Sequence, residues 1–548
     1  MRVPFKIPNF ESLEKRLSQR VWRLNYSDLV VLTAVAVYTV VLSYLTILKY
    51  YAFKVYAADL GIVNQSLWTT LFAGRFLYST VESLYIPSGV FLAIHFSPIM
   101  FLIMPVYAIF PSPETLLVLQ SFIIGFGAIP IFWVARDALK SRLTGVVLAL
   151  MYLLYAPIQA LNWHDFHMQA FLPLFFTLSL YYLMKSKWRR FFVFLILAMI
   201  CEEHAAILVI FIGLYVGWRH KDQLSLLVKR RTLKSKEFLM MPITVAMGAT
   251  WYLFTLWFRG TFFSINPNLV YEFVGAGNFG ILGVSDVWEI PFAAVSQPLK
   301  FMELLSFDWQ LKVLYIVLFF APLAFLSVFD SVLLAAAPWI AFSMMSQTAV
   351  HHVLSKHHYS AYIISFVFIA GIRGFKKVLE RVVEKHKFGG AKGLLMFVLV
   401  CSVVMSAVST PLSPVLNILY PGYYQDGGFP QVTKHEVLLS EVIQMVPSDA
   451  SILTQDRIFP HVSSRVDAYV VPTPLLKDPS KRDLVVEYVN TIISKVDYVL
   501  VDEKFDPYVS KFVVSLLRRK GGFGLFVSAG ENTIRLYKRG YTDATTYL

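Results

Sequence analysis

Long runs of apolar residues, separated by short polar segments, make up most of the first 410 positions of this chain. A helix needs about 20 predominantly apolar residues to cross the hydrocarbon core of a bilayer, and many of these runs approach that length. The pattern therefore predicts an α-helical multi-pass membrane domain at residues 29–410. The expected spans are residues 29–48, 115–136, 143–160, 169–184, 191–218, 238–258, 311–328, 331–347, 359–374 and 393–410.

Short basic clusters between the apolar runs orient them, because Lys and Arg are enriched in the cytoplasmic loops of membrane proteins. The basic segment 1–28 precedes a span long enough to remain as an anchor, so we expect the N-terminus in the cytoplasm. Residues 191–218 carry a basic cluster at each end, which predicts two short helices that enter and leave on one side and turn at Cys201–His204. The clusters are Arg136–Arg142, Lys185–Arg190, Arg219–Lys236 and Arg373–Lys392.

If the apolar stretch Phe91–Phe110 were a full span, every later segment would cross the membrane in the opposite direction, and the later basic clusters would lie outside. The stretch contains Pro98 and Pro105, so we interpret it as a juxtamembrane or re-entrant segment of a long first external loop, residues 49–114. The count is then about 11 membrane helices, an odd number that places the C-terminus outside. The same loop contains a helical apolar stripe suited to lying along the membrane interface, formed by Leu60, Val63, Leu67 and Leu71.

The pattern changes at about Pro411, where short alternating segments replace the long apolar runs. Residues 411–548 therefore predict a small α/β domain outside the membrane on the external side. The expected strands are Ser451–Gln455, Ala468–Val471, Tyr498–Asp502 and Leu525–Ser528, and the expected helices are residues 435–446, 482–495 and 506–520.

The composition of the chain agrees with a membrane protein and excludes several classes of function. The chain is 57% hydrophobic and only 15% charged, which excludes an ordinary soluble enzyme. The net charge of +14 comes from the clusters that orient the spans, so it does not indicate a nucleic-acid partner. The two cysteines, Cys201 and Cys401, are too few for a disulfide framework or a cysteine-rich zinc site.

Titratable residues gather at the predicted external ends and turns of the spans. Eight of the 12 histidines of the chain lie there, and polar groups beside the hydrocarbon are costly enough that their presence favours a functional role. The external groups are Asp59, His95, His164, Asp165, His167, Glu202, Glu203, His204, His351, His352, His357 and His358.

Each of these groups also has a structural interpretation. Asp59 precedes a predicted helix and could be its N-cap rather than a catalytic acid. Asp165 and His167 could lie in a hydrated loop, and paired histidines can be hydrogen-bonded structural residues rather than metal ligands. Adjacent carboxylates at Glu202 and Glu203 would repel each other without a cation, a proton or a basic ligand, which favours function.

Two external cations, Arg75 and Lys356, are nearest in sequence to these acids and histidines. A lipid-linked phosphate would need one or two such donors at the interface. Either side chain could instead anchor the protein at the membrane surface by snorkelling.

Several short motifs together resemble the prokaryotic membrane proteins grouped as domain of unknown function 2079. The resemblance covers roughly residues 50–540, and one departure is Cys201, where the family pattern leads us to expect a lysine before the acid. The motifs are Ala58-Asp59-Leu60-Gly61-Ile62, Gln65, Leu67-Trp68, Gly74-Arg75-Phe76, His95-Phe96-Ser97-Pro98, Pro105-Val106-Tyr107, Asp165-Phe166-His167, Glu202-Glu203, His358-Tyr359, Pro460-His461 and Arg465.

That family is in turn similar in architecture to the GT-C glycosyltransferases, which have a long first external loop with an acidic residue near its start. The resemblance implies a GT-C-like membrane fold in which Asp59 takes the place of that acid and Asp165 lies in the second external loop. It also implies a transferase that moves a sugar from a polyprenyl-phosphate carrier to an acceptor on the external face, with inversion.

On this hypothesis the catalytic residues are Asp59, Asp165, Glu202 and Glu203, and a divalent metal would be held by Asp165, His167 and Glu202. The residues expected to bind substrate are Arg75, His95, His167, Lys356, His358 and Tyr359. A transporter or channel, which would place polar groups near the bilayer midplane, and a non-catalytic scaffold of the cell envelope remain as alternatives. The expected partners are membrane lipid and the lipid-linked sugar, without nucleic acid.

Overall fold

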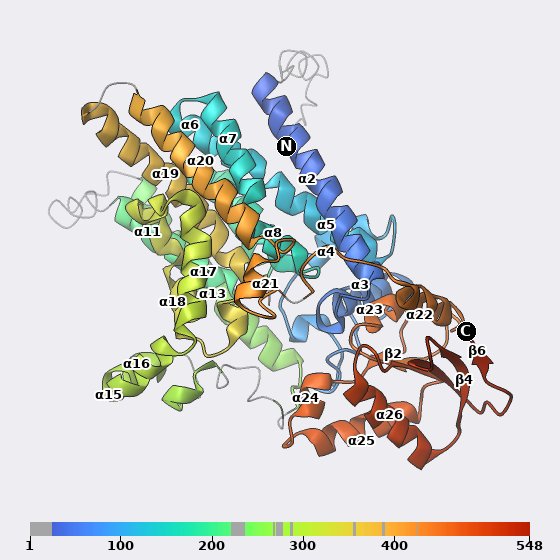
Figure 1. The fold of residues 1–548 in the computed structure, drawn as a ribbon. Helices are drawn as coiled ribbons and strands as arrows, with labels where there is room; N and C mark the ends of the chain where they lie inside the picture. The colour runs from blue at the N-terminus through green and yellow to red at the C-terminus, as the bar shows by residue number, and fades with distance from the viewer. Residues whose placement is uncertain are drawn as a thin grey trace, which may run out of the picture.

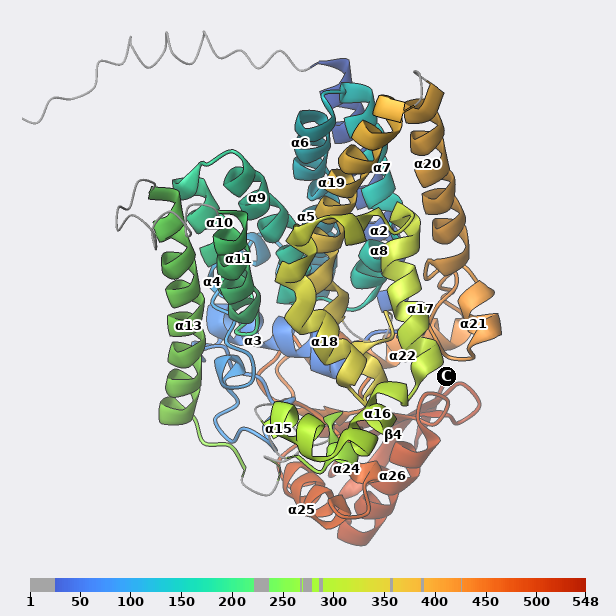
Figure 2. The same cartoon turned by 90° about the vertical axis from the view of Figure 1, so that its left-hand side faces the viewer.

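The structure is a computed structural model, and it describes residues 25–220, 236–266, 269, 278–284, 289–354, 358–385, 389–424 and 426–548. Helices make up most of the described residues between 25 and 424, and a small mixed sheet with flanking helices forms the C-terminal part (Figure 1). We call the part from Lys434 onward the tail domain. Figure 2 shows the tail domain below the long helices, with the Tyr26 end of the first helix, α2, at the opposite end.

The long helices follow the predicted apolar runs. The first span is α2, and the run 115–136 forms α5 and α6, which together make one apolar segment, Pro113–Leu139. The helices of this part are α2 (Tyr26–Tyr51), α5 (Pro113–Phe126), α6 (Ala128–Leu139), α7 (Arg142–Leu154), α8 (Ala156–Trp163), α9 (Leu172–Met184), α10 (Trp188–Met199), α11 (Ala205–Arg219), α13 (Lys236–Phe262), α17 (Trp309–Phe320), α18 (Ala337–Met345), α19 (Ala361–Lys385) and α20 (Gly389–Ser409).

Among the described residues, four helices are long and apolar enough to cross a membrane, and there are up to six if each bent pair counts as one span. The bent pairs are α7 with α8, at 42°, and the residues Pro298–Ser306 with Trp309–Leu323, at 61°. Shorter apolar helices occupy three more of the predicted runs, at Met168–Met184, Ala205–Arg219 and Ser331–Met345. The total of about 11 spans therefore stays a prediction.

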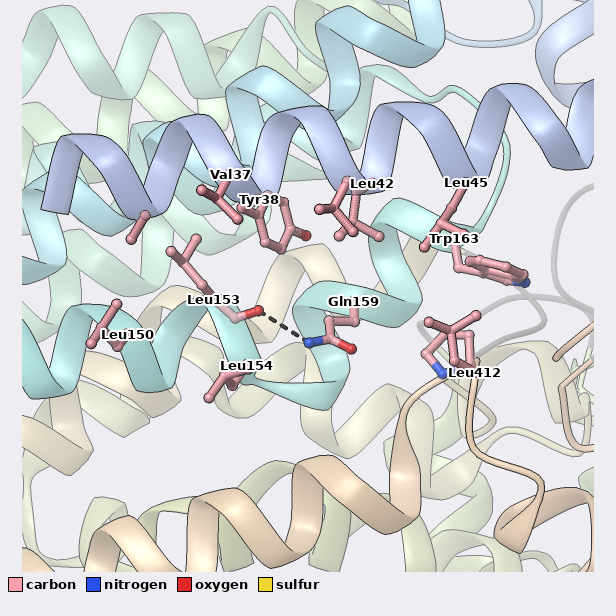
Figure 3. A pocket seen from close by; sticks show the side chains of 13 residues that line it. Val37, Tyr38, Leu42, Leu45, Leu150, Leu153, Leu154, Gln159, Trp163 and Leu412 are labelled. Atoms are coloured by element: carbon pink, nitrogen blue, oxygen red, sulfur yellow. Dashed lines mark hydrogen bonds between the residues drawn. The ribbon is translucent and has the colours of Figure 1, made fainter. Parts of the chain in front are cut away.

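The bend between α7 and α8 has a local cause in the sequence. Pro157 has no backbone N–H, so the carbonyl of Leu153 loses its helical donor, and proline disrupts the preceding turn. The side-chain amide of Gln159 replaces that donor, with its Nε2 atom 3.2 Å from the Leu153 oxygen (Figure 3).

Two other sequence predictions describe short elements correctly. Residues 191–218 form two helices, α10 and α11, that are joined by a turn at Cys201–His204. The stretch Phe91–Phe110 contains only a three-residue 3₁₀ turn and the eight-residue helix α4 (Met100–Tyr107), which is too short to span. The other short helices of this part include η1 (Ala57–Gly61), α3 (Ile62–Phe72), η3 (Met168–Phe171), α15 (Ile290–Ser296), α16 (Pro298–Ser306), η11 (His358–Ser360) and α21 (Val415–Leu419).

The apolar stripe of the first loop packs differently from the prediction. Leu60, Val63 and Leu67 are each at most 2% exposed, so they face the protein interior rather than a lipid surface. Their helices, η1 and α3, pack against the tail domain, which the sequence pattern of the loop alone did not reveal.

The tail domain is the α/β unit that the sequence predicts, with a six-stranded sheet in the order β2-β1-β3-β5-β4-β6. Strands β1, β2 and β3 pair in parallel, β5 pairs antiparallel with β3 and β4, and β6 pairs in parallel with β4. The elements are β1 (Ile452–Thr454), β2 (Ala468–Val470), β3 (Tyr498–Asp502), β4 (Phe523–Ala529), β5 (Ile534–Arg539), β6 (Thr546–Tyr547), α22 (Lys434–Gln444), α23 (Phe459–Val462), α24 (Thr473–Lys477), α25 (Arg482–Ile493) and α26 (Pro507–Lys520).

The tail domain is docked on the first loop through both apolar and polar contacts. Phe53 and Ala57 belong to the same buried cluster as residues of the tail sheet. The ring of His461 stacks on Tyr50 at 4.0 Å and on Phe53 at 3.9 Å between ring centroids. The amide nitrogen of Gln65 lies 3.2 Å from the carbonyl oxygen of Ala468. The loop therefore lies between the membrane helices and the tail domain.

Candidate functional site

Asp59 lies at the centre of a group of imidazoles from three separate segments. Its Oδ1 atom is 2.8 Å from Nε2 of His167, and its Oδ2 atom is 3.5 Å from Nε2 of His164. Asp59 is on η1, at the start of the first loop, and both histidines are in the connection between α8 and η3. The ring of His358, on η11, lies 3.9 Å from the ring of His167. We call Asp59, His164, His167 and His358 the imidazole cluster.

The hydrogen bonds of His167 define its protonation. Its Nδ1 atom is 2.7 Å from the backbone oxygen of Asp165, which can only accept, so Nδ1 carries a hydrogen. Its Nε2 atom faces the Asp59 carboxylate, so one proton is shared along that contact. Burial favours neutral groups, but His167 and His164 hold the pKa of Asp59 well below its usual range, and Asp59 raises the pKa of His167. The pair is therefore a carboxylate with an imidazolium.

Asp165 holds the loop that carries both histidines. Its Oδ1 atom is 2.9 Å from Nζ of Lys49, in an ion pair with side-chain exposures of 4% and 1%, and its Oδ2 atom accepts the backbone N–H of Tyr56 at 2.7 Å. These contacts link the end of α2, the start of the first loop and the connection between α8 and η3. Sequence analysis did not single out Lys49, although a lysine in the last turn of a span was a usable signal for such a pair.

A second cluster lies at the turn between α10 and α11. The Oε1 atom of Glu203 is 2.6 Å from Nη1 of Arg259, and its Oε2 atom accepts the backbone N–H of Phe96 at 2.8 Å. Glu202 accepts the hydroxyl of Tyr362 at 2.5 Å and pairs with the imidazole of His204. The repulsion expected between the two adjacent carboxylates is thus relieved by a basic partner for each. We call His95, Glu202, Glu203, His204 and Arg259 the glutamate cluster.

The electrostatics of the glutamate cluster agree with these contacts. Burial would raise the pKa of Glu202, but His204 and then His95 lower it to about 2. Burial lowers the pKa of His204, and Glu202 outweighs it and raises that pKa to about 9. The pKa of Glu203 is raised, first by burial and then by the charge of Glu202. The turn therefore contains a stable ion pair between Glu202 and a charged His204.

Two residues connect the clusters. The ring of Tyr359 lies 4.7 Å from the ring of His358 and 6.5 Å from that of Tyr362, whose hydroxyl donates to Glu202. Burial lowers the pKa of His95 to about 4, and this ring responds to Glu202 and, more weakly, to His167. Its buried Nδ1 atom has no hydrogen-bond partner within the described ranges of the chain. The two clusters are therefore neighbours at one end of the helices.

The tail domain and the first loop add two acids beside Asp59. The Oδ1 atom of Asp456 accepts the backbone N–H of Ala57 at 2.8 Å. Burial, followed by the charges of Asp59 and Asp165, raises the pKa of Asp456 to about 6. Burial, followed by the charges of Asp59 and Asp456, raises the pKa of Glu82 to about 7. Neither acid was predicted, because each meets Asp59 only through the docking of the tail domain.

The predicted site residues fall into three groups. Asp59, His167, His358 and Tyr359 meet around the imidazole cluster, with Asp165 behind it, and His95, Glu202 and Glu203 lie in the glutamate cluster. Arg75 is exposed and lies over the ring of Tyr78, with 5.1 Å between its Cζ atom and the ring centroid. Lys356 lies outside the described residues. The structure thus brings together most of the acids and histidines.

Comparison with known families covers most of the chain. Residues 49–518 match the family described as a predicted membrane protein, domain of unknown function 2079, or DUF2079. The chain belongs to this family. No curated protein matches the chain. The matched region of this DUF2079 protein contains both clusters and the docking surface of the tail domain.

An apolar cavity lies along α2 in this DUF2079 protein. It measures about 430 Å³ and lies between α2 and the bent pair α7–α8 (Figure 3). Val37, Leu42 and Leu45 line it from α2, and Trp163 lines it at the end of α8. Trp163 directly precedes His164, and its backbone oxygen is 3.0 Å from Nζ of Lys49. The cavity therefore runs along a membrane span towards the charged residues.

Proposed function

We propose that this DUF2079 protein is a membrane glycosyltransferase that moves a sugar from a polyprenyl-phosphate carrier to an acceptor on the external face. The observation that carries this proposal is the Asp59 carboxylate, kept ionised beside His167 at the start of the first loop. An ionised carboxylate at a membrane surface can accept a hydrogen bond from an acceptor hydroxyl and then its proton. The GT-C resemblance assigns this role to the same residue.

The proposed transfer forms one bond to the anomeric carbon of the sugar and breaks another, with atoms and charge conserved. The acceptor oxygen bonds to the anomeric carbon of the sugar from the face opposite the phosphate, and its proton passes to Asp59. The bond between that carbon and the phosphate oxygen breaks, and its electron pair leaves with the polyprenyl phosphate. The imidazoles of His167, His164 and His358 are the cationic or hydrogen-bonding groups available to the departing phosphate.

The apolar cavity supports a lipid-linked donor. Its lining is almost entirely hydrocarbon, which suits a chain of isoprene units, and it lies along α2, a helix long enough to span. Trp163 lines one end of the cavity (Figure 3) and directly precedes His164 in the sequence, so a chain held in the cavity could direct its phosphate towards the imidazole cluster. A phosphate at that end would also meet the charged groups that surround Lys49.

The topology that we propose has about 11 membrane helices in a GT-C-like arrangement, with the N-terminus cytoplasmic and the tail domain external. The opposite placement of the Tyr26 end of α2 and of the tail domain supports this orientation (Figures 1 and 2). The basic connections between α6 and α7 and between α9 and α10 support it as well.

The proposal is tested by the lipids of cells that lack this protein. We expect such cells to accumulate a polyprenyl-phosphate sugar, measured by mass spectrometry of lipid extracts, and the wild-type gene to restore the normal level. Asp59→Asn should fail to restore it while the protein is present in the membrane in normal amounts. Asp543→Asn, which changes an exposed acid near the C-terminus, is the matched control and should restore it. An unchanged lipid profile in cells without the protein would contradict the proposal.

A further inference from the structure

We propose that His164, His167 and His358 bind one divalent transition-metal ion of the zinc class beside the Asp59 carboxylate. One ring nitrogen of each histidine lies within 4.8 Å of the corresponding nitrogens of the other two. Tetrahedral zinc sites are built from such imidazole nitrogens and carboxylate oxygens, at about 2.0–2.2 Å from the ion. Small side-chain movements would bring these donors to that distance.

The ring of His167 is oriented as that of a metal ligand usually is. A ligating imidazole generally donates its other N–H to a carbonyl or carboxylate, and Nδ1 of His167 donates to the Asp165 oxygen. This leaves Nε2 facing Asp59. Gln120, on α5, fixes the backbone on both sides, because its Oε1 accepts the N–H of His167 at 3.0 Å and its Nε2 donates to the carbonyl of His164 at 3.0 Å. Two of the three imidazoles are thus held in place by the fold.

The charges around Asp59 also favour a cation. Lys49 neutralises Asp165, and Arg457 pairs with Asp426 at 3.1 Å. The Oδ1 atom of Asp456 accepts the backbone N–H of Ala57, two residues before Asp59, at 2.8 Å. A divalent ion bound by neutral imidazoles would balance the negative charge of Asp59 and its acidic neighbour.

The other group of donors with suitable spacing is less suited to an ion. His95, Glu202 and Glu203 also place donor atoms within 4.8 Å of one another. However, Arg259 and His204 already compensate both glutamates, and a dication would have to displace them or face their charges. Charge and the preference of zinc-class ions for imidazole nitrogen therefore both favour the imidazole cluster.

This metal site stands on the geometry of the cluster and does not depend on the transferase activity. It differs from the set expected from the sequence, which shared only His167 with it. In the structure Asp165 instead pairs with Lys49, and Glu202 pairs with His204 and Tyr362. If the transfer reaction does occur, the ion would lie where it could bind a phosphate oxygen.

The test is metal binding by the full chain, purified in detergent without a polyhistidine tag. After treatment with a chelator and dialysis against Zn²⁺ or Co²⁺, the wild type should retain about one ion per chain by elemental analysis. His164→Ala and His358→Ala should each lower the affinity at least tenfold, whereas His95→Ala should leave it unchanged. Retention of the ion by His358→Ala with its loss in His95→Ala would overturn the assignment, as would a wild type that retains none.

A second kind of variant distinguishes the loss of a metal ligand from misfolding of the alanine variants. His358→Cys offers a thiolate in place of an imidazole, so its Co²⁺ form should gain a strong thiolate-to-cobalt absorption band. The matched control His95→Cys should not gain that band. Its appearance in His95→Cys and not in His358→Cys would place the ion in the glutamate cluster and overturn the proposal.

Discussion

Lys49 and Asp165 form a buried ion pair of 2.9 Å across 116 residues of sequence, and this pair positions the loop that carries His164 and His167. It joins the last turn of α2 to the connection between α8 and η3. Because Asp165 also accepts the N–H of Tyr56, the same carboxylate fixes the backbone just before Asp59. A single buried carboxylate therefore organises both sides of the imidazole cluster.

Removal of one partner of this pair should be strongly destabilising. Lys49→Met leaves Asp165 buried without its cation, which typically costs about 3–5 kcal/mol. We expect a large fall in the thermal unfolding temperature of the purified protein, followed by tryptophan fluorescence. Arg142→Met is the control, because its ion pair with Asp28 is 3.4 Å long and 45% exposed on the arginine side. Such a pair contributes about 0–1 kcal/mol, so equal effects of the two variants would contradict this interpretation.

The stability of the docked tail domain should fall as the pH rises. The pKa of Glu82 is about 7 in the folded protein and near its ordinary value of about 4.3 when the chain is unfolded. Between these values the folded state keeps a proton that the unfolded state has lost, so stability is greatest below about pH 4.3 and is lost as the pH rises through 7. Asp456, with a pKa of about 6, acts in the same direction.

Glu82→Gln should therefore flatten the dependence of unfolding temperature on pH between about pH 5 and 8. The pH-dependent contribution of Glu82 to the free energy of unfolding is a few kcal/mol at most, since each pKa unit corresponds to about 1.4 kcal/mol. Glu487→Gln, at an exposed position of α25, is the control and should keep the wild-type slope. A Glu82→Gln variant with the full wild-type slope would contradict the prediction.

The close approach of the tail domain requires glycine at position 61. A Cβ atom there would lie 2.7 Å from Cδ1 of Phe459, a distance that real Cβ contacts do not show. Gly61→Val should force the rigid ring away and destabilise docking by about 1–3 kcal/mol. Limited proteolysis of the purified protein should then release the tail domain faster. Gly260→Val is the control, because nothing lies within 4 Å of the corresponding Cβ; equal proteolysis rates would contradict the prediction.

The proposed topology predicts which surfaces are reached from outside the cell. A cysteine introduced by Glu531→Cys, at an exposed position of the tail domain, should react with a membrane-impermeant maleimide in intact cells. A cysteine introduced by Ser186→Cys, in the connection between α9 and α10, should react only after the membrane is permeabilised. The reverse pattern would invert the topology and contradict an external imidazole cluster.

The sequence predicts the elements of this fold well because their signals are local. The run 29–48 is α2, and the turn at Cys201–His204 lies between the two short helices that its flanking basic clusters predict. The strand Tyr498–Asp502 is predicted at both ends, because five consecutive buried residues make a strong pattern. By contrast β5, in which Arg535 and Lys538 interrupt the apolar positions, was not predicted.

The contacts of the site were less accessible from the sequence. Asp59, His167 and His358 were recognised as candidates, but their convergence depends on packing between segments more than 100 residues apart, such as the 108 between Asp59 and His167. The partners Lys49 and Gln120 were missed, because each is an isolated polar residue within an apolar helix. Arg259 was noted as an external cation, but its ion pair with Glu203 was not predicted. Asp456 and Glu82 were missed because their positions depend on how the tail domain docks.

The central claim is that Asp59 serves as the group that accepts the proton of the acceptor in a sugar transfer. The most direct measurement is release of polyprenyl phosphate from polyprenyl-phosphate sugars by the protein reconstituted in lipid, with a panel of donors and the cell-envelope fraction as acceptor. We predict that Asp59→Asn lowers the rate by about 10²–10⁴-fold while its unfolding temperature stays near that of the wild type. A well-folded Asp59→Asn variant that turns over at the wild-type rate would contradict the claim.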